Sequence, residues 1–180
     1  MIYLTSDFHF AHNMDFIYKA RGFENIDQMN KAVVENINNT LKEDDELYVL
    51  GDLVLDDFDE GYKYLKMIKP KMHIILGNHD TDKKVEAYRK LENVVSVSFA
   101  EAITYKRKRF FLCHYPVILD DGNSENPDIR DWCLHGHTHS RKKYQFLNCY
   151  NIGLDAHKCY PVSIEQVYND TKNHKNNSPE

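Results

Sequence analysis

The chain has 180 residues, with 28 acidic and 23 basic side chains that give a formal net charge of −5. At roughly 150 residues per domain, this length predicts one domain. Hydrophobic residues make up 42% of the chain, which is enough for one apolar core. The negative net charge disfavours a general nucleic-acid-binding protein, because such proteins present a basic surface to the phosphates.

The sequence shows neither a membrane-spanning segment nor a secretory signal. No window approaches the roughly 18 apolar residues of a transmembrane helix. The first ten residues, MIYLTSDFHF, lack a basic region followed by an apolar stretch. The four cysteines form no C-x-x-C pair, so a thiolate zinc site is not expected. We therefore expect a cytoplasmic protein whose thiols are reduced and buried.

Strands alternate with helices in the first half of the chain. Apolar runs that end in polar or glycine-containing turns predict strands at 2–4, 47–50 and 72–76. Between them, helical spacing of apolar residues predicts one helix over 29–41, with Asp27 as its N-cap, and a second over 62–68 that ends near Pro70. This order is typical of βαβ units, so we expect at least partly parallel pairing.

The second half is predicted to be richer in strands. Apolar runs predict strands at 94–99, 102–105, 110–113 and 132–134, and two more near 145–152 and 161–168. Residues 119–131 have the composition of a loop. A single domain is therefore expected over residues 1–168, and the polar segment 169–180 is expected to be a disordered tail.

Residues that can bind a metal ion follow the predicted strands in both halves. They are Asp7, His9, Asp52, Asn78, His79, His114, His137 and His139. Ligands and catalytic groups gather at the carboxyl ends of strands in open α/β sheets, so we expect these side chains to converge. His137 and His139 alternate, and an extended segment would point both to the same face.

The ordered motifs resemble those of the calcineurin-like metallophosphoesterases. They are D-F-H at 7–9, G-D at 51–52, G-N-H-D at 77–80, histidine at 114 and G-H-T-H at 136–139. The late N-I-G-L-D at 151–155 is similar to that of a small bacterial and phage branch. The resemblance implies an α/β (α+β) fold, a four-layer αββα sandwich of two mixed β-sheets flanked by helices.

The same resemblance implies a binuclear metal centre. One metal would be held by Asp7, His9, Asp52 and His139, and the other by Asp52, Asn78, His114 and His137. Asp52 would therefore bridge the two ions. A hydroxide between the metals would attack phosphorus, while His79 would face the leaving group as general acid or transition-state stabiliser.

The donor types and charges are consistent with this chemistry. Two divalent ions carry four positive charges against the two carboxylates of Asp7 and Asp52, so the site would attract a phosphate ester and neutralise charge in the transition state. Carboxylate, amide and imidazole donors suit Mn, Fe, Zn, Co or Ni and do not select among them. Manganese is our first choice.

Four further residues are candidates for substrate binding or for support of the site. His12 could touch a substrate phosphate, against a surface or capping role. Many family members carry an acid that orients the catalytic histidine at the position of Leu55, so Asp80 or Asp56 could orient His79 instead. Arg141, two residues after His139, could grip a phosphate. Whether the later residues Asn151 and Asp155 reach the site stays open.

We therefore expect a metal-dependent phosphoesterase, and favour a phosphodiesterase by analogy with the family. A nucleotide pyrophosphohydrolase or a phosphomonoesterase on the same site is the alternative. A more remote one is an inactive scaffold, which is disfavoured because all seven implied ligands are present. The expected substrate is a small phosphate ester or a nucleotide-like molecule. No membrane partner is expected, nucleic acid is a possible but not a favoured partner, and the oligomeric state is left open.

Overall fold

Four parallel strands and one antiparallel edge strand form the first sheet. The computed structural model describes residues 1–119, 131–146 and 148–174. In this sheet the strands lie in the order β10-β1-β2-β3-β4, with only β10 antiparallel to its neighbour. The bounds are β1 Ile2–Thr5, β2 Glu46–Leu50, β3 Lys71–Ile75, β4 Val94–Ser98 and β10 Val162–Ser163. β1, β2 and β3 agree closely with the strands predicted for the first half of the chain.

Both faces of this sheet are buried, which explains the continuous apolar runs of its strands. In β2, Leu47 and Val49 belong to one core cluster, while Tyr48 and Leu50 belong to the other. A parallel strand between two apolar layers needs hydrophobic residues on both sides, so period-two alternation is lost.

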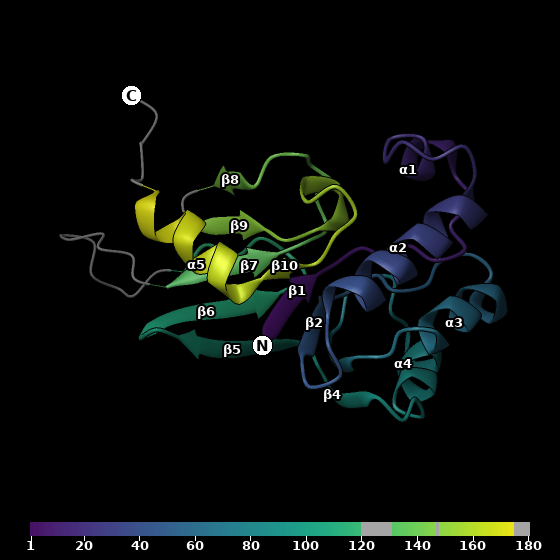
Figure 1. Cartoon of the computed structure of the whole chain (residues 1–180), viewed down its shortest axis with the longest axis horizontal. Helices are drawn as coiled ribbons and strands as arrows, with labels where there is room; N and C mark the ends of the chain where they lie inside the picture. The colour runs from purple at the N-terminus through teal and green to yellow at the C-terminus, as the bar shows by residue number, and fades with distance from the viewer. Residues whose placement is uncertain (120–130, 147, 175–180) are drawn as a thin grey trace.

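Helices cover the outer face of the first sheet (Figure 1). They are α1 Asp15–Tyr18, α2 Ile26–Thr40, α3 Phe58–Lys66 and α4 Asp82–Tyr88. The N-cap of α2 is Asn25 and not Asp27 as predicted, because the Asn25 side chain accepts a hydrogen bond from the Gln28 amide. Within the described residues, no helix is both long and apolar enough to cross a membrane; the cytoplasmic location stays a prediction.

The second sheet packs its inner face against the first. Its strands lie in the order β5-β6-β7-β9-β8, with a parallel centre of β6, β7 and β9 and antiparallel edges. The bounds are β5 Ala100–Tyr105, β6 Lys108–Cys113, β7 Trp132–His135, β8 Tyr144–Phe146 and β9 Cys149–Asn151. Leu112, Leu134 and Tyr150 share a core cluster with Leu50 and Ile75 of the first sheet. Two mixed sheets flanked by helices were predicted, and this prediction is confirmed.

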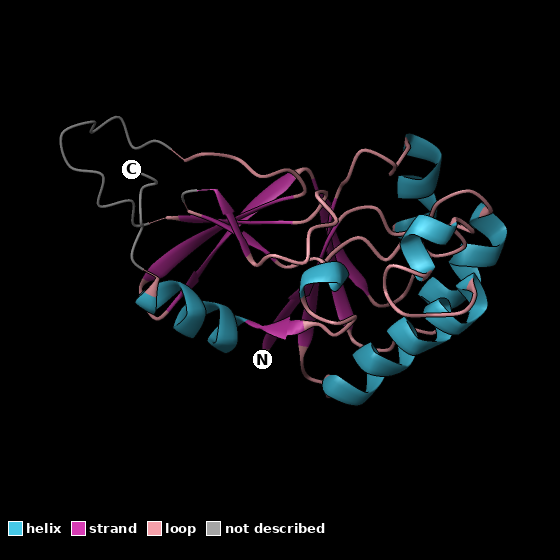
Figure 2. Cartoon of the chain, turned by 90° about the horizontal axis from the view of Figure 1, so that it is seen from above, coloured by secondary structure: helices cyan, strands magenta, loops and turns pink. Residues whose placement is uncertain are grey.

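The C-terminal part differs from the sequence prediction in two ways. The strand predicted over 161–168 consists of the short β10 and then helix α5, Ile164–Asn173, which Figure 2 shows apart from the other helices. The disordered tail was therefore wrong for residues 169–173, which are helical. The strand predicted near 145–152 is the β8–β9 pair. The predicted 119–131 loop falls almost wholly outside the described residues.

Helix α5 is anchored by both apolar and polar side chains. Ile164 and Val167 enter the core between the sheets. On the following turn, the Asp170 carboxylate accepts hydrogen bonds from the Tyr150 hydroxyl at 2.6 Å and from the Lys143 ammonium at 3.1 Å. Tyr150 is fully buried, so its hydroxyl depends on this carboxylate. Helix α5 therefore continues through the polar residue Asp170, because the second sheet supplies hydrogen-bond partners for its carboxylate.

Replacing Asp170 should destabilise the fold. Asp170→Ala leaves the buried Tyr150 hydroxyl without its acceptor, which costs on the order of 1–3 kcal/mol. Urea unfolding followed by circular dichroism measures this loss. Lys172→Ala, an exposed residue on the same helix, is the control and should change the unfolding free energy by less than about 0.5 kcal/mol. Equal effects of the two substitutions would contradict this role of Asp170.

Candidate metal centre

The side chains that follow the strands of the two sheets converge at one end of the fold. Asp7 lies two residues after β1, Asp52 lies two residues after β2, and His114 follows β6 directly. Two groups have ligand atoms that all lie within 4.8 Å of one another, and these are Asp7 with His9 and His139, and Asp7 with Asp52 and His114. The convergence expected from the strand ends is therefore present.

Asp52 occupies the middle of this cluster. Its Oδ2 atom lies 3.7 Å from His9 Nε2 on one side and 3.5 Å from His114 Nε2 on the other. Asp7 Oδ1 lies 4.0 Å from the same His9 nitrogen. A carboxylate between imidazoles of both groups has the placement that a bridging ligand requires.

The remaining predicted ligands border the second group. Asn78 Oδ1 lies 2.9 Å from His114 Nε2. The His137 ring lies 5.0 Å from the His114 ring, centroid to centroid, and the His137 backbone amide lies 3.1 Å from both carboxylate oxygens of Asp7. All seven residues implied as ligands are thus in one cluster, while their coordination of two metals stays a prediction.

Five of these seven residues have a left-handed backbone, which side-chain-bearing residues seldom adopt. The φ angles are 59° at Asp7, 53° at His9, 55° at Asp52, 65° at His137 and 48° at His139. Each such residue costs about 1–3 kcal/mol, and its conformation persists only where the surrounding structure holds it in place. Two backbone hydrogen bonds between the loops contribute, from Asp7 N to Gly51 O and from His9 N to Asp52 O, both at 3.0 Å. Backbone strain therefore concentrates where the ligands are presented.

A glycine is required where the second sheet approaches Asp7. A Cβ atom on Gly136 would lie 2.0 Å from Ser6 Oγ and 2.4 Å from Asp7 Oδ2, so no side chain fits. The Ser6 hydroxyl donates a hydrogen bond to the same Asp7 oxygen. Gly136 thus lets β7 and β1 place their ligands against each other.

Burial dominates the electrostatics of the cluster. Asp7 and Asp52 are only 1% and 2% exposed, and burial raises the pKa of Asp7. Burial also lowers the pKa of His9 well below its ordinary value and, with the nearby His114, lowers the pKa of His137. Burial acts in the same direction on His139, but Asp155 and Asp7 outweigh it and raise its pKa.

The cluster has the properties of a cation site. The His9 Nε2 atom is buried and has no hydrogen-bond partner within the described residues, although it faces two carboxylates. An imidazole nitrogen in this position is left available as a ligand. Oxygen and imidazole donors together suit a divalent transition metal. The residues present therefore fit the metals that the sequence motifs imply.

His79 lies at the open side of the cluster. Its side chain is 49% exposed, and its Nε2 atom lies 4.0 Å from Asp52 Oδ2. Its backbone amide donates a hydrogen bond to Asp52 Oδ1 at 3.0 Å, which fixes the backbone from which the imidazole extends. His79 belongs to neither ligand group, so its imidazole is free to meet a bound molecule.

The two acids considered as orienters of His79 have other contacts. The Asp80 carboxylate accepts hydrogen bonds from the amides of Asp52 and Gly77, both at 2.9 Å, and from the Tyr88 hydroxyl at 3.0 Å. Asp80 therefore supports the backbone of Asp52 and not the His79 ring. Asp56 Oδ2 lies 4.0 Å from His12 Nε2. Within the described residues, neither acid has a recorded contact with the His79 imidazole.

His12 lies behind a ligand. Its Nδ1 atom lies 2.9 Å from His9 Nδ1, and the two rings stack with centroids 5.2 Å apart. This contact engages the His9 nitrogen that faces away from the carboxylates, so His9 Nε2 is left for a metal. A contact of His12 with substrate phosphate stays a prediction.

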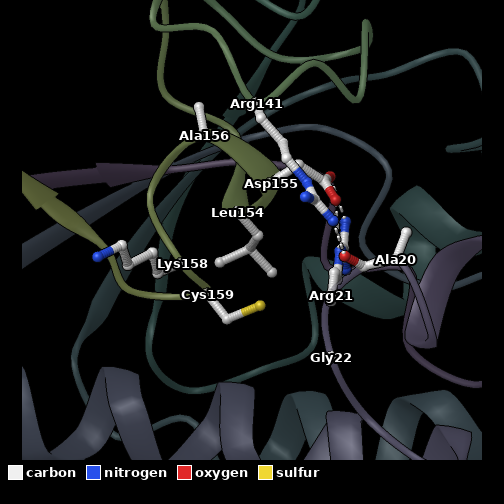
Figure 3. Close-up of a pocket in the computed structure, with 9 residues that line it drawn as sticks. All are labelled: Ala20, Arg21, Gly22, Arg141, Leu154, Asp155, Ala156, Lys158 and Cys159. Carbon is white, nitrogen blue, oxygen red and sulfur yellow. Dashed lines mark hydrogen bonds and ion pairs between the residues drawn. The ribbon is translucent and has the colours of Figure 1, made fainter.

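Arg141 lies in the wall of a cavity that shares Asp155 with the metal centre (Figure 3). The cavity has a volume of about 440 Å³ and is lined by Ala20, Arg21, Gly22, Arg141, Leu154, Asp155, Ala156, Lys158 and Cys159. One Arg141 nitrogen donates to the Ala20 carbonyl at 2.6 Å. The structure thus places Arg141 beside the ligand cluster and not among the ligands.

The sequence did not decide whether Asn151 or Asp155 reaches the metal centre. Asp155 Oδ2 lies 3.0 Å from His139 Nδ1, so Asp155 reaches the site. Asp155 lies four residues after β9. The tendency of functional residues to gather after strand ends could therefore have indicated it. Asn151 instead supports the nearby loop, because its side chain donates to the Ser140 carbonyl at 3.0 Å and accepts from the Gly153 amide at 2.8 Å.

Comparison with known families agrees with the motifs and the fold. The family model described as the calcineurin-like phosphoesterase superfamily domain matches residues 1–149. The chain therefore belongs to the calcineurin-like phosphoesterase superfamily, and this membership suggests a hydrolase of phosphoric esters.

Individual relatives extend this likeness over most of the chain. The uncharacterized protein MJ1445 of Methanocaldococcus jannaschii is 32% identical over 174 residues, which cover 92% of this chain and 88% of that protein. The structure of AQ665 from Aquifex aeolicus, a protein of unknown function, has a TM-score of 0.69 and 26% identity, and covers 94% of this chain and 98% of that one. A novel archaeal phosphodiesterase, with a TM-score of 0.50, 16% identity and coverage of 84% and 82%, shares the fold.

Substitution of Gly136 should disrupt metal binding specifically. Gly136→Ala forces a methyl group against Ser6 and Asp7, so we expect metal affinity to fall by about 10–100-fold, as for other changes in the groups that orient a ligand. Metal content after dialysis against limiting Mn²⁺, measured by atomic emission, reports the loss.

The matched control is Gly61→Ala. A Cβ atom there would lie 2.4 Å from Val54 Cγ1, which is a clash of similar severity in the packing between α3 and the loop after β2. This variant should lower thermal stability and keep its metal. Equal metal loss in both variants would show that Gly136 acts only through general stability.

Proposed function

We propose that this protein is a metal-dependent phosphodiesterase that hydrolyses a P–O bond. The observation that carries this proposal is the pair of buried carboxylates, Asp7 and Asp52, enclosed by imidazoles with half-exposed His79 at the open side. Membership in the phosphoesterase superfamily supports the same reaction class.

The metal centre would consist of two divalent ions held by the residues implied from the motifs. Asp52 would be shared, since it lies between His9 and His114. When bound, the two ions would activate a water molecule and neutralise charge on the phosphoryl oxygens. Manganese is the ion we propose first, and Fe, Zn, Co and Ni suit the same donors.

The protein's own residues would position and protonate the substrate. His79 has its backbone fixed by Asp52 and its imidazole exposed, so its Nε2 atom can donate a proton to a leaving-group oxygen. In the described structure its ring nitrogens have no carboxylate within hydrogen-bonding distance, the nearest being Asp52 at 4.0 Å. The imidazole therefore keeps the freedom to follow the leaving group.

The substrate would be a small phosphodiester, and nucleotide-like molecules are the first class to screen. The cavity beside the centre supports a substrate with a further anionic group. The Arg21–Asp155 pair is neutral as a whole, and Arg141 adds a positive charge to the lining. Its volume of about 440 Å³ falls within the range of small-molecule sites. Pyrophosphate and monoester substrates are the alternatives for the same centre.

Removing and restoring the metal tests the proposed reaction. Metal-stripped protein should not hydrolyse bis-p-nitrophenyl phosphate, and added Mn²⁺ should restore turnover, because the carboxylates and imidazoles alone cannot activate water sufficiently. Asp52→Asn should reduce the restored kcat by at least about 100-fold through loss of a shared ligand. Unchanged hydrolysis by metal-free protein would contradict the proposal.

Removal of His79 should affect substrates according to their leaving groups. His79→Ala should keep its bound metal and lose about 10²–10⁴-fold in kcat on a dinucleoside monophosphate, whose alkoxide must be protonated. The loss on bis-p-nitrophenyl phosphate should be much smaller, since p-nitrophenolate leaves without a proton. Steady-state kinetics on both substrates checks this, with His174→Ala as a histidine control. Equal losses on the two substrates would rule out a general acid.

A further inference from the structure

A buried ion pair lies behind part of the metal centre. The Arg21 side chain is 1% exposed and the Asp155 side chain 11%. Arg21 Nε donates to Asp155 Oδ1 at 3.1 Å, and Arg21 Nη2 donates to Asp155 Oδ2 at 2.8 Å, as the dashed lines of Figure 3 show. This two-point contact fixes the orientation of both groups.

The carboxylate of this pair reaches one ligand. Asp155 Oδ2, which accepts from Arg21, also lies 3.0 Å from His139 Nδ1. A carboxylate in this position keeps the proton on Nδ1 and leaves the lone pair of Nε2 for a metal. Asp155 therefore selects both the tautomer and the ring orientation of His139.

The guanidinium of the pair reaches the backbone of two more ligands. Arg21 Nη2 donates to the Asp7 carbonyl at 2.8 Å, and Arg21 Nη1 donates to the Phe8 carbonyl at 3.2 Å. These two peptide groups connect Asp7 to His9, and both of those residues have a left-handed backbone. Arg21 thus holds the strained turn that presents both side chains.

The three ligands reached in this way form one group. Asp7, His9 and His139 have ligand atoms within 4.8 Å of one another, and with the shared Asp52 we name them the first metal position. Asp7 also lies near Asp52 and His114, but the motifs assign it to the first position only. Asp52, Asn78, His114 and His137 are named the second metal position, so Asp52 is common to both positions.

The second metal position has a different support. Asp80 accepts hydrogen bonds from the amides of Asp52 and Gly77, and Asn78 directly follows Gly77 in the chain. Among the described contacts, Arg21 and Asp155 make none with the four residues of this position. The carboxylate of Asp155 therefore supports ligands of the first metal position, while the carboxylate of Asp80 supports the backbone at Asp52 and Gly77.

We propose that the Arg21–Asp155 ion pair is a positioning unit for the first metal position alone, and sets its metal affinity independently of the second. This inference rests on the proposed two-metal centre. Arginine is needed because its planar fork serves the Asp155 carboxylate and two carbonyls at once. Lysine would keep the charge but could not make this set of contacts.

Metal stoichiometry measured in variants tests this selectivity. Metal-stripped protein is titrated with Mn²⁺ by calorimetry, and Mn²⁺ electron paramagnetic resonance distinguishes spin-coupled pairs from isolated ions. The unaltered chain should bind two ions as a coupled pair. Asp155→Asn and Arg21→Lys should weaken one binding event by about 10–100-fold, keep the other, and show only the signal of an isolated ion near one equivalent of Mn²⁺.

The matched control is Lys158→Ala. Lys158 lines the same cavity as Arg21 and Asp155 and has no recorded hydrogen bond or ion pair among the described residues. This variant should bind two ions with unchanged affinities. Loss of an ion in this variant would mean that the cavity wall in general, and not the ion pair, supports the centre.

Two further measurements distinguish a loss of metal binding from a loss of folding. Circular dichroism checks that each variant is folded. If one buried charge left without its partner unfolds the chain, the double variant Arg21→Met with Asp155→Asn removes both charges and is titrated in the same way.

Two results would overturn the inference while leaving the proposed function intact. In one, the variants bind both ions with unchanged affinities; in the other, they lose both ions equally. Absence of Mn²⁺ binding by the unaltered chain would instead contradict the proposed function itself, and the inference with it.

Discussion

The structure depends on the burial of two carboxylates, Asp7 and Asp52, at the meeting point of two sheets. Each is almost fully shielded from water, and like charges in such surroundings are costly unless donors or cations compensate them. Backbone amides of His137 and His79 and the Ser6 hydroxyl supply part of this compensation. A divalent cation bound between these carboxylates and the surrounding imidazoles would supply the rest, which gives a physical reason for placing metals here.

The loops that carry these groups are held in conformations that they would not adopt alone. Left-handed backbone occurs at five of the implied ligands, and strain of this kind persists only where the surrounding structure over-determines it. Asp80 ties the Asp52 loop to Gly77, and Arg21 ties the Asp7–Phe8 turn to Asp155. Regular strands provide the rigid frame, while side chains behind the ligands hold the loops in their functional conformation.

The sequence predicted regular elements best where apolar runs were long and flanked by clear turns. β2 and β3 coincide with such runs because a buried parallel strand must be apolar on both faces. Prediction failed over 161–168, where β10 has only two residues and Ser163 then caps helix α5. Helix α5 extends through polar residues since Asp170 finds Tyr150 and Lys143 as partners, and local composition does not reveal partners from another sheet.

The sequence by itself determined which residues would surround the centre, because the types and order of Asp7, Asp52 and His114 mark the ends of strands that must meet at one edge. Only the tertiary structure decided which groups stand behind them. Arg21 and Asp155 are 134 positions apart, and Asp80 serves the backbone of Asp52 rather than the adjacent His79. Motif spacing encodes the ligands because each sits at a fixed offset from its own strand. The supporting contacts join segments whose proximity arises only when both sheets have packed together.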